Sequence, residues 1–241
     1  MRPQQGLVAD VVRFSWVDGP GNRFVVFLQG CNFDCPGCQN PHTIPVHSPQ
    51  ARLVSVPELL GEIRPVAPFL SGVTVSGGEA TLQPRFVRDL FEAIKRTPDL
   101  AGLTTFVDSN GAATVATWNL LIPVMDGAML DLKALDDDVH RRLTGRPNHR
   151  VLTSIRHLAR ARRLFEVRLL LVPGVNDNPD QLRRTAEWLL SVDPSVRVKV
   201  IGFRTHGVRA AAHDWPEPTE EQMAGYAEVL AASGVRGAVL V

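Results

Sequence analysis

The sequence predicts an α/β fold, a partial TIM-like barrel of six β/α units. Short apolar runs rich in β-branched residues alternate with longer stretches of helical periodicity along the 241 residues. The apolar runs are typical of strands buried on both faces, as in a parallel sheet covered by helices. An open, doubly wound sheet also fits this alternation. The barrel is favoured because the distinctive polar clusters follow the carboxyl ends of strands, which converge on one mouth in a barrel.

Six strands are predicted, with helical segments between them. The strands lie at residues 24–28, 72–76, 104–108, 127–131, 166–172 and 196–202. The helical segments lie at residues 56–67, 84–96, 115–125, 149–163, 179–192 and 220–233. Pro57, Pro84 and Pro179 stand at or near the first position of a helical segment, where a missing N–H costs no hydrogen bond. Right-handed crossovers then place the strands in one parallel sheet.

Residues 1–241 are expected to form a single domain with an addition at each end. About residues 1–22 form an N-terminal extension, in which Asp18-Gly19-Pro20-Gly21 makes a tight turn between a strand at 13–17 and the first barrel strand. About residues 219–241 add a C-terminal helix and a short apolar strand.

The composition excludes several classes of protein. With 44% hydrophobic and 21% charged residues, the chain is neither disordered nor fibrous. The formal net charge of +1 gives no support to a strongly basic nucleic-acid binder. The first residues lack a secretory signal, and no apolar run is long enough to cross a bilayer. We therefore expect a cytoplasmic protein that binds neither nucleic acid nor membrane and works as a monomer.

All three cysteines of the chain, Cys31, Cys35 and Cys38, lie within eight residues. An odd number at this spacing is a poor disulfide framework. Soft thiolates select zinc or an iron–sulfur cluster. A [4Fe-4S] cluster held by three cysteines leaves one iron open to a small molecule, which is a reactive arrangement. Two alternatives are a Cys3His zinc site completed by His42 or His47, and three cysteines that are simply buried.

Further polar residues follow the other predicted strands. Gly77-Gly78-Glu79 allows close approach of backbone to a ligand, with a carboxylate beside it. Asp108 and Ser109 end one strand, although a lone aspartate there is commonly a helix cap. Asp131 and Lys133 end the next and, two residues apart, face the same side of an extended segment. Arg204, Thr205 and His206 follow the last barrel strand.

These motifs give the chain a specific resemblance. It resembles the radical S-adenosylmethionine (SAM) enzymes that activate glycyl radical enzymes. The likeness rests on VDGPGNRFVVFLQGCNFDCPGCQNP and continues, in the family's order, through SGGEATLQP, DSNG, MLDLKALDDDVHRRLTGRPNHRVL and VRLLLVPGVND. The cysteine spacing alone indicates only the superfamily, whereas the DGPG–R segment and the block at 129–152 are typical of the activating branch.

The resemblance implies a cofactor and a reaction. Cys31, Cys35 and Cys38 would hold a [4Fe-4S] cluster whose open iron binds SAM. An electron from reduced flavodoxin or ferredoxin would then cleave SAM, under anaerobic conditions, to methionine and a 5′-deoxyadenosyl radical. That radical would take a hydrogen from the Cα of a glycine in a partner glycyl radical enzyme. The cofactor carries the difficult chemistry, and the protein supplies orientation and exclusion of water.

The resemblance also implies which residues meet SAM. The expected contacts are Gly77, Gly78, Glu79, Asp108, Ser109, Asp131, Lys133 and either or both of Arg204 and His206. In some relatives the residues at Asp108, Ser109, Met129 and Asp131 surround a monovalent cation. The charged segment at 136–150 reads as a solvated helix face with a cap at Asn148, and the resemblance adds partner contact for some of its basic residues.

Two departures from the family pattern, and three alternative functions, accompany this interpretation. Gly37 stands where many superfamily members have an aromatic residue near the adenine, so we expect Phe33 to help instead. No cysteine is left for an auxiliary cluster. The first alternative is a radical SAM enzyme acting on a small molecule, as a deazaguanine synthase does. The others are a non-catalytic zinc-binding protein and a scaffold that keeps the cluster without cleaving SAM.

Overall fold

The computed structural model describes residues 4–241 and divides them into two compact units. The first unit comprises the residues up to Asn32 together with His42–Ser109 and Ala113–Met129. The second comprises Phe33–Pro41, Asn110–Ala112 and Leu130–Val241. The single-domain organisation expected for residues 1–241 stays a prediction.

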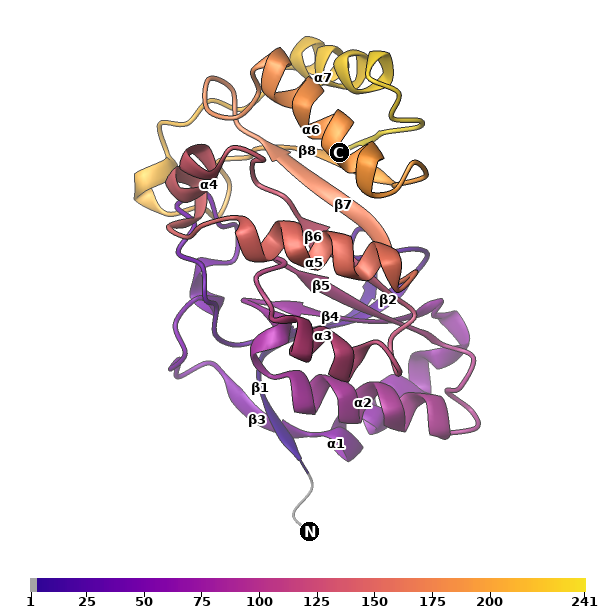
Figure 1. Cartoon of the computed structure of the whole chain (residues 1–241). Coiled ribbons are helices and arrows are strands. Elements are labelled where there is room, and N and C mark those ends of the chain that lie inside the picture. The colour runs from indigo at the N-terminus through magenta and orange to yellow at the C-terminus, as the bar shows by residue number, and fades with distance from the viewer. Residues whose placement is uncertain (1–3) are drawn as a thin grey trace. The chain divides into compact units, whose positions relative to one another are not determined.

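The first unit is built on a sheet in the order β3-β1-β2-β4-β5-β6 (Figure 1). Its strands are β1 (Gln5–Ser15), β2 (Arg23–Leu28), β3 (Arg52–Ser55), β4 (Gly72–Gly77), β5 (Thr104–Ser109) and the start of β6 (Gly127–Asp131). β1 pairs antiparallel with both β2 and β3, whereas β2, β4 and β5 are parallel, with Phe24 opposite Val73 and Val75 opposite Val107. The parallel core confirms the predicted α/β class.

Three α-helices accompany this sheet: α1 (Val56–Ile63), α2 (Pro84–Arg96) and α3 (Val115–Leu121). Ser55 and Glu58 form a capping box at the start of α1, and Thr114 caps α3. Two predicted helices end early because a proline lacks the N–H that the next turn needs. The segment at 56–67 becomes a 3-10 helix from Arg64 to Phe69, and the segment at 115–125 stops at Leu121, two residues before Pro123.

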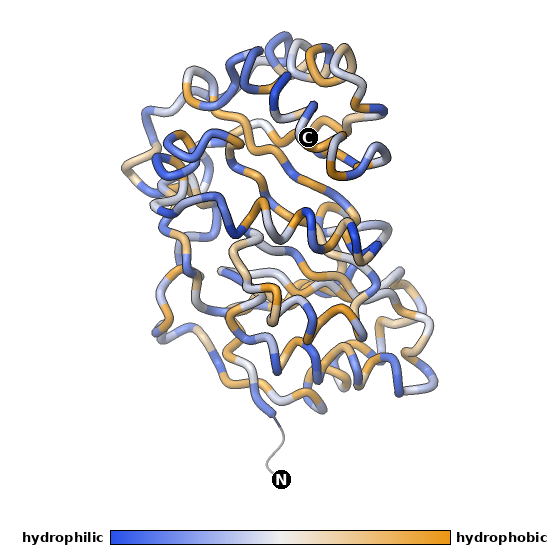
Figure 2. The backbone as a smooth tube through the Cα atoms, viewed as in Figure 1, coloured by the Kyte–Doolittle hydropathy of each residue, from blue (hydrophilic) through white to orange (hydrophobic). Residues whose placement is uncertain are grey.

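The second unit contains parallel strands in the order β7 (Leu164–Leu171), β8 (Val198–Gly202) and β9 (Val239–Leu240). Its helices are α4 (Asp137–Thr144), α5 (His149–Arg160), α6 (Pro179–Val192) and α7 (Glu220–Ala232). Figure 2 shows hydrophobic residues along much of β7, whereas the helices carry a mixture of hydrophilic and hydrophobic residues. Among residues 4–241, no helix is both long enough and apolar enough to cross a membrane.

Some elements differ from the sequence prediction. β1 begins at Gln5, not at residue 13. It pairs with β3 over Gln5–Val8 and with β2 over Val8–Ser15, so most of its length has one neighbouring strand. Only three of its eleven residues are buried, so the apolar pattern that marks a buried strand is weak there. Trp16 and Val17, assigned to a strand, follow the end of β1 and are 76% and 62% exposed. β3 has four residues, too few for a periodic signal.

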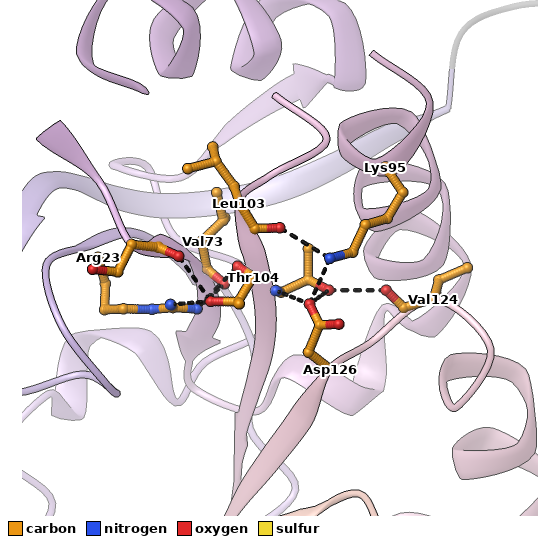
Figure 3. Close-up of polar contacts among 9 residues, drawn as sticks. Arg23, Val73, Lys95, Leu103, Thr104, Val124 and Asp126 are labelled. Atoms are coloured by element: carbon orange, nitrogen blue, oxygen red, sulfur yellow. Dashed lines mark hydrogen bonds and ion pairs between the residues drawn. The ribbon is translucent and has the colours of Figure 1, made fainter. Parts of the chain in front are cut away.

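Arg23 is a fully buried cation in the first unit (Figure 3). Its guanidinium donates hydrogen bonds to the Thr74 hydroxyl (3.1 Å), the Val73 carbonyl (2.8 Å) and the Thr104 hydroxyl (2.6 Å). It also lies over the Phe106 ring, 4.9 Å from the centroid. Burial lowers the pKa of Arg23 to about 10, so the side chain is charged at neutral pH. This one cation joins β2, β4 and β5 at their amino ends.

We expect Arg23→Met to lower the free energy of unfolding by about 2–4 kcal/mol, because the buried Val73 carbonyl and two hydroxyls lose their donor. Urea unfolding of the purified protein measures the change. Arg85→Met, at an exposed position, is the matched control and should change the free energy by about 0.5 kcal/mol or less. Equal stability of the two variants would contradict this role for Arg23.

Candidate functional site

The Gly77-Gly78-Glu79 segment lies at the end of β4 in the first unit, bonded to the chain that leads into Cys31. The Gly78 N–H donates to the Leu28 carbonyl (2.8 Å), and the Glu79 N–H donates to the Gly30 carbonyl (2.9 Å). A Cβ at Gly78 would lie 2.3 Å from the Gly30 oxygen, and Gly77 has a φ of +115°. Both glycines are therefore required by this backbone approach, whatever else they contact.

The carboxylate of Glu79 is buried, with 1% of the residue exposed. Its Oε1 accepts hydrogen bonds from the Thr81 N–H (2.8 Å) and the Ser109 hydroxyl (2.8 Å). Ser109 was expected in the same site, so the fold brings these two predicted residues together. Asp108 accepts a hydrogen bond from the Ser76 hydroxyl (2.9 Å) and does not cap α3, so the alternative reading as a helix cap is wrong.

Cys35 and Cys38 lie in the second unit, on a loop fastened to α4. The Asp34 N–H donates to the Thr144 carbonyl (3.1 Å), and the Phe33 ring meets the edge of His140 with centroids 5.7 Å apart. Arg209 completes the fastening, because its guanidinium binds both the Asp34 carboxylate (2.7 Å) and the Asp34 carbonyl (2.6 Å). Three separate contacts thus fix the residues just before Cys35.

Gly37 of this loop packs against two aromatic rings. A Cβ at Gly37 would lie 3.0 Å from the Phe203 ring and 3.1 Å from the Trp215 ring, and these rings are 5.6 Å apart between centroids. An aromatic side chain at position 37 would need the space that Phe203 and Trp215 already fill. Phe33, expected to help at the adenine, is only 4% exposed and is packed inside this unit.

The electrostatics of the second unit suit a cluster ligated by thiolates. Burial raises the pKa of Cys35 to about 11 and also raises that of Cys38, while Lys133 and Arg209 oppose both shifts. The Lys133 ammonium donates to the Asp131 carboxylate at 2.8 Å, which confirms that these two side chains face the same side. Burial lowers the pKa of Lys133, but the charges of Asp131 and Cys35 raise it by more. The pKa is therefore above its usual value, and the ammonium stays charged.

The donor set fits an iron–sulfur cluster. None of the three cysteines forms a disulfide and all are partly buried, and a thiol gives up its proton when it binds a metal. Across residues 4–241, no three His, Cys, Asp or Glu side chains gather closely enough to hold a single metal ion. Within the second unit, Lys133 and Arg209 are the cations that favour the thiolate forms of Cys35 and Cys38.

The two candidates after β8 differ in their surroundings. Arg204 is exposed and pairs with Glu217 at 3.4 Å, while the Thr205 N–H binds the same carboxylate at 2.8 Å. These hydrogen bonds, that from Thr205 above all, lower the pKa of Glu217. His206 is exposed. Gly207 has a φ of +78° and packs against the loop at Gln39. A Cβ added at Gly207 would lie 3.0 Å from the Gln39 carbonyl oxygen.

Asn148 is the N-cap residue of α5, as predicted, although its side chain makes no capping hydrogen bond. The prediction of a solvated helix face at residues 136–150 is wrong at His140 and Asn148. His140 is fully buried, and burial together with Lys133 lowers its pKa to about 4. Asn148 is also buried, and its amide donates to the Leu135 carbonyl (2.7 Å) instead of capping α5. His140 faces the loop that carries Phe33, and Asn148 faces the loop that precedes α4. A linear charge pattern reveals neither orientation. The arginines of this segment are exposed.

Sequence reasoning missed two sets of buried polar residues. The Asn176 amide donates to the carbonyls of Lys133 and Leu170, each at 2.7 Å, and so holds the segment that carries Lys133. On β7, Glu166 and Arg168 form a buried ion pair at 3.1 Å. Their signal was visible as two charges inside a strand otherwise built of apolar residues.

We expect Gly37→Tyr to destabilise the protein by about 1–3 kcal/mol, because the new ring must displace Phe203 or Trp215. Adding Trp215→Gly should recover part of that loss, and urea unfolding of the four proteins in this double-mutant cycle measures the coupling. Gly61→Tyr, where nothing lies within 4 Å of the added Cβ, is the control. Additive effects at positions 37 and 215 would contradict the packing described here.

Known proteins match both the sequence and the fold. Residues 25–189 match the radical SAM superfamily. The pyruvate formate-lyase-activating enzyme of Staphylococcus epidermidis is 34% identical over 88% of this chain and 84% of its own. A crystallised domain of pyruvate-formate lyase-activating enzyme from Bacteroides vulgatus has 28% identity and a TM-score of 0.58, covering 70% of this chain and 98% of that one.

Streptococcus suis SuiB bound to its precursor peptide is similar in fold alone, with a TM-score of 0.68 at 13% identity over 92% of this chain and 47% of SuiB. Together with the family match, these likenesses confirm the predicted partial (β/α)6 barrel of the radical SAM type. The chain belongs to the radical SAM superfamily and, within it, to the family of enzymes that activate glycyl radical enzymes.

Proposed function

We propose that this protein converts a partner glycyl radical enzyme into its active form by taking one hydrogen from the Cα of a glycine in that partner. The single observation that carries the proposal is the 34% identity, over 88% of the chain, to enzymes named for activating pyruvate formate-lyase. The three thiols at C-x3-C-x2-C spacing, none of them in a disulfide, are the ligands that this chemistry needs.

Cys31, Cys35 and Cys38 would hold the [4Fe-4S] cluster. When bound, the cluster would supply the one electron that cleaves SAM to methionine and a 5′-deoxyadenosyl radical. Because only three cysteines are present, they would leave part of the cluster open to the amino and carboxylate groups of SAM. In the second unit, Lys133 and Arg209 favour the thiolate forms of Cys35 and Cys38, so they help to keep these ligands deprotonated.

The proposed contacts to SAM come from residues at strand ends, namely Gly77, Gly78, Glu79, Asp108, Ser109, Asp131, Lys133, Arg204 and His206. Support differs among them. Asp131 and Lys133 present opposite charges 2.8 Å apart, which suits a ligand that carries both an ammonium and a carboxylate. Glu79 is fixed by Ser109 and Thr81, so its carboxylate is pre-organised. Gly78 is committed to the Gly30 backbone, so its contribution is the shape of the segment.

This mechanism assigns no proton transfer to a protein side chain. His140, the buried histidine of α4, has a pKa lowered to about 4 by burial and by Lys133, and it is neutral at physiological pH. Its role in the proposal is to support Phe33 and the loop that carries Cys35. The residues of the chain therefore bind, orient and shield the cofactors.

The same proposal includes several further points. Reduced flavodoxin or ferredoxin supplies the electron, and the protein works as a cytoplasmic monomer. A monovalent cation near Asp108 and Asp131 stays a prediction. Membership in the radical SAM family leaves no support for a non-catalytic zinc protein, and no observation on this chain favours a small-molecule substrate.

Anaerobic reconstitution with iron and sulfide tests the cluster. We expect a broad charge-transfer absorption, and 5′-deoxyadenosine after addition of dithionite and SAM. Replacing Cys31, Cys35 or Cys38 singly with Ala should remove both signals, because two thiolates do not retain the cluster. His42→Ala/His47→Ala should keep both, since the histidines belong only to the zinc alternative. Loss of absorption in the histidine variant, or its survival in a cysteine variant, would contradict this assignment.

The partner is tested by electron paramagnetic resonance. Incubating the reconstituted protein, SAM and dithionite with a pyruvate formate-lyase should produce a glycine-centred doublet. The doublet should be absent when the radical-bearing glycine of that partner is replaced by Ala. Formation of 5′-deoxyadenosine without any protein radical would instead indicate a small-molecule substrate.

A further inference from the structure

The loop that joins β7 to α6 in the second unit is closed by the side chain of a buried residue, Asn176. Asn176 is 4% exposed, and its side-chain oxygen accepts a hydrogen bond from the Val172 N–H at 2.7 Å. Its amide group donates to the Leu170 carbonyl and to the Lys133 carbonyl, each at 2.7 Å. Lys133 lies 43 residues earlier in the chain. Asn176 therefore links this loop to the segment that carries Lys133.

The backbone at Lys133 is fixed on both sides of that residue. The Leu132 N–H donates to the Arg168 carbonyl of β7 at 2.9 Å, and the Lys133 carbonyl accepts the hydrogen bond from Asn176. From this backbone the Lys133 side chain reaches Asp131, where its ammonium donates to the carboxylate at 2.8 Å. Because a side chain starts from its own backbone, a shift of the Lys133 peptide group moves the ammonium with it.

The next residue of the loop, Asp177, joins the loop to α7. One carboxylate oxygen of Asp177 accepts a hydrogen bond from the Gly174 N–H, and the other accepts one from the Tyr226 hydroxyl, each at 2.8 Å. Tyr226 lies on α7, is 6% exposed and is the only tyrosine of the chain. Figure 1 shows α7 beside α6, the helix that follows the loop. α7 therefore holds the loop through the Tyr226 hydroxyl.

Helix capping does not account for these bonds. The N-cap residue of α6 is Asn178, whose side chain accepts a hydrogen bond from the Asp180 N–H at 2.9 Å. Packing does not account for the Tyr226 hydroxyl, because a phenylalanine ring would fill the same space, and a buried hydroxyl needs a hydrogen-bond partner. Asn178 thus starts α6, whereas Asn176 and Asp177 fix the course of the loop.

We propose that Asn176 is a positioning residue for Lys133 and that Tyr226, acting through Asp177, is a second one. The inference rests on the proposed function, in which the Lys133 ammonium contacts SAM. A group that binds a ligand must be held to within about 0.5 Å, and hydrogen bonds from neighbouring residues supply that precision. Tyr226 lies beyond residue 189, where the superfamily match ends, so α7 adds to the site from outside the matched region.

Binding of SAM to the reconstituted, oxidised protein tests the positioning. Isothermal titration calorimetry under anaerobic conditions and without a reductant measures Kd in the absence of turnover. Asn176→Ala should raise Kd about tenfold, because the Lys133 carbonyl loses its donor, and Tyr226→Phe should raise it about threefold. Tyr226→Phe keeps the ring and removes only the hydrogen bond, so it tests the inference even where Asn176→Ala impairs folding.

Asn178→Ala is the matched control. It removes a hydrogen bond of the same loop, the cap of α6, and should lower stability about as much as Tyr226→Phe does. Because Asn178 does not contact the Lys133 segment or Asp177 through its side chain, its Kd for SAM should change by about twofold or less. Equal losses of SAM affinity in Asn178→Ala and Tyr226→Phe would overturn the inference, since both would then reflect stability alone.

A double-mutant cycle shows whether Asn176 acts through Lys133. Lys133→Met should by itself raise the Kd for SAM about tenfold, because a charged contact is lost. In the Lys133→Met protein, Asn176→Ala should add about twofold or less. A full further tenfold loss would overturn the inference, because Asn176 would then affect SAM by another route. An unchanged Kd in Lys133→Met would overturn it as well.

Hydrogen exchange of the metal-free protein gives a readout that needs neither cluster nor SAM. Amides in a peptide that covers residues 130–136 should exchange about tenfold faster in Asn176→Ala and about threefold faster in Tyr226→Phe, with no change in Asn178→Ala. Unchanged exchange in the first two variants would overturn the inference. Failure of the unmodified, reconstituted protein to bind SAM would instead overturn the proposed function, whatever the exchange shows.

Discussion

The constraint on which the Gly77-Gly78-Glu79 segment of the first unit depends is contact between two stretches of backbone. The end of β4 approaches the end of β2 so closely that neither Gly77 nor Gly78 has room for a side chain. Because the Glu79 N–H is bound to the Gly30 carbonyl, the position of Glu79 is tied to the residue that precedes Cys31. A loop that must present a thiolate at a fixed place gains that precision from the sheet and not from its own turns.

Positive charge is handled differently at three places in the chain. Arg23 is buried without a bound carboxylate and is stabilised by hydroxyls, carbonyls and the Phe106 ring. Lys133 and Arg209 are placed beside thiols whose pKa burial raises, so they compensate a charge that appears only when metal binds. The arginines of α4 and α5 lie at the surface, where Arg141 pairs with Asp137 at 2.6 Å and Arg156 lies over the Trp188 ring.

The sequence predicted the elements whose signal is local. The bounds of α2 and α6 agree with prediction because a proline marks the first turn of each and apolar residues recur at helical spacing. It could not predict that His140 and Asn148 point inward, since that depends on which loop packs over α4. Nor could it show why Gly37 replaces an aromatic residue, because Phe203 and Trp215 lie far away along the chain. The side-chain pair that the sequence did predict, Asp131 with Lys133, consists of near neighbours along the chain.

The aromatic pair beside Gly37 also bears on where the functional module ends. The superfamily match stops at residue 189, whereas Phe203, Arg209 and Trp215 all come later. A fragment that ends at residue 189 would keep every cysteine. It would lose the Phe203 and Trp215 rings and the Arg209 guanidinium, which hold the loop that carries Cys35 and Cys38. The shortest chain able to bind a cofactor here is therefore set by the residues that support the cysteine loop. These residues lie beyond the part of the chain that matches the family.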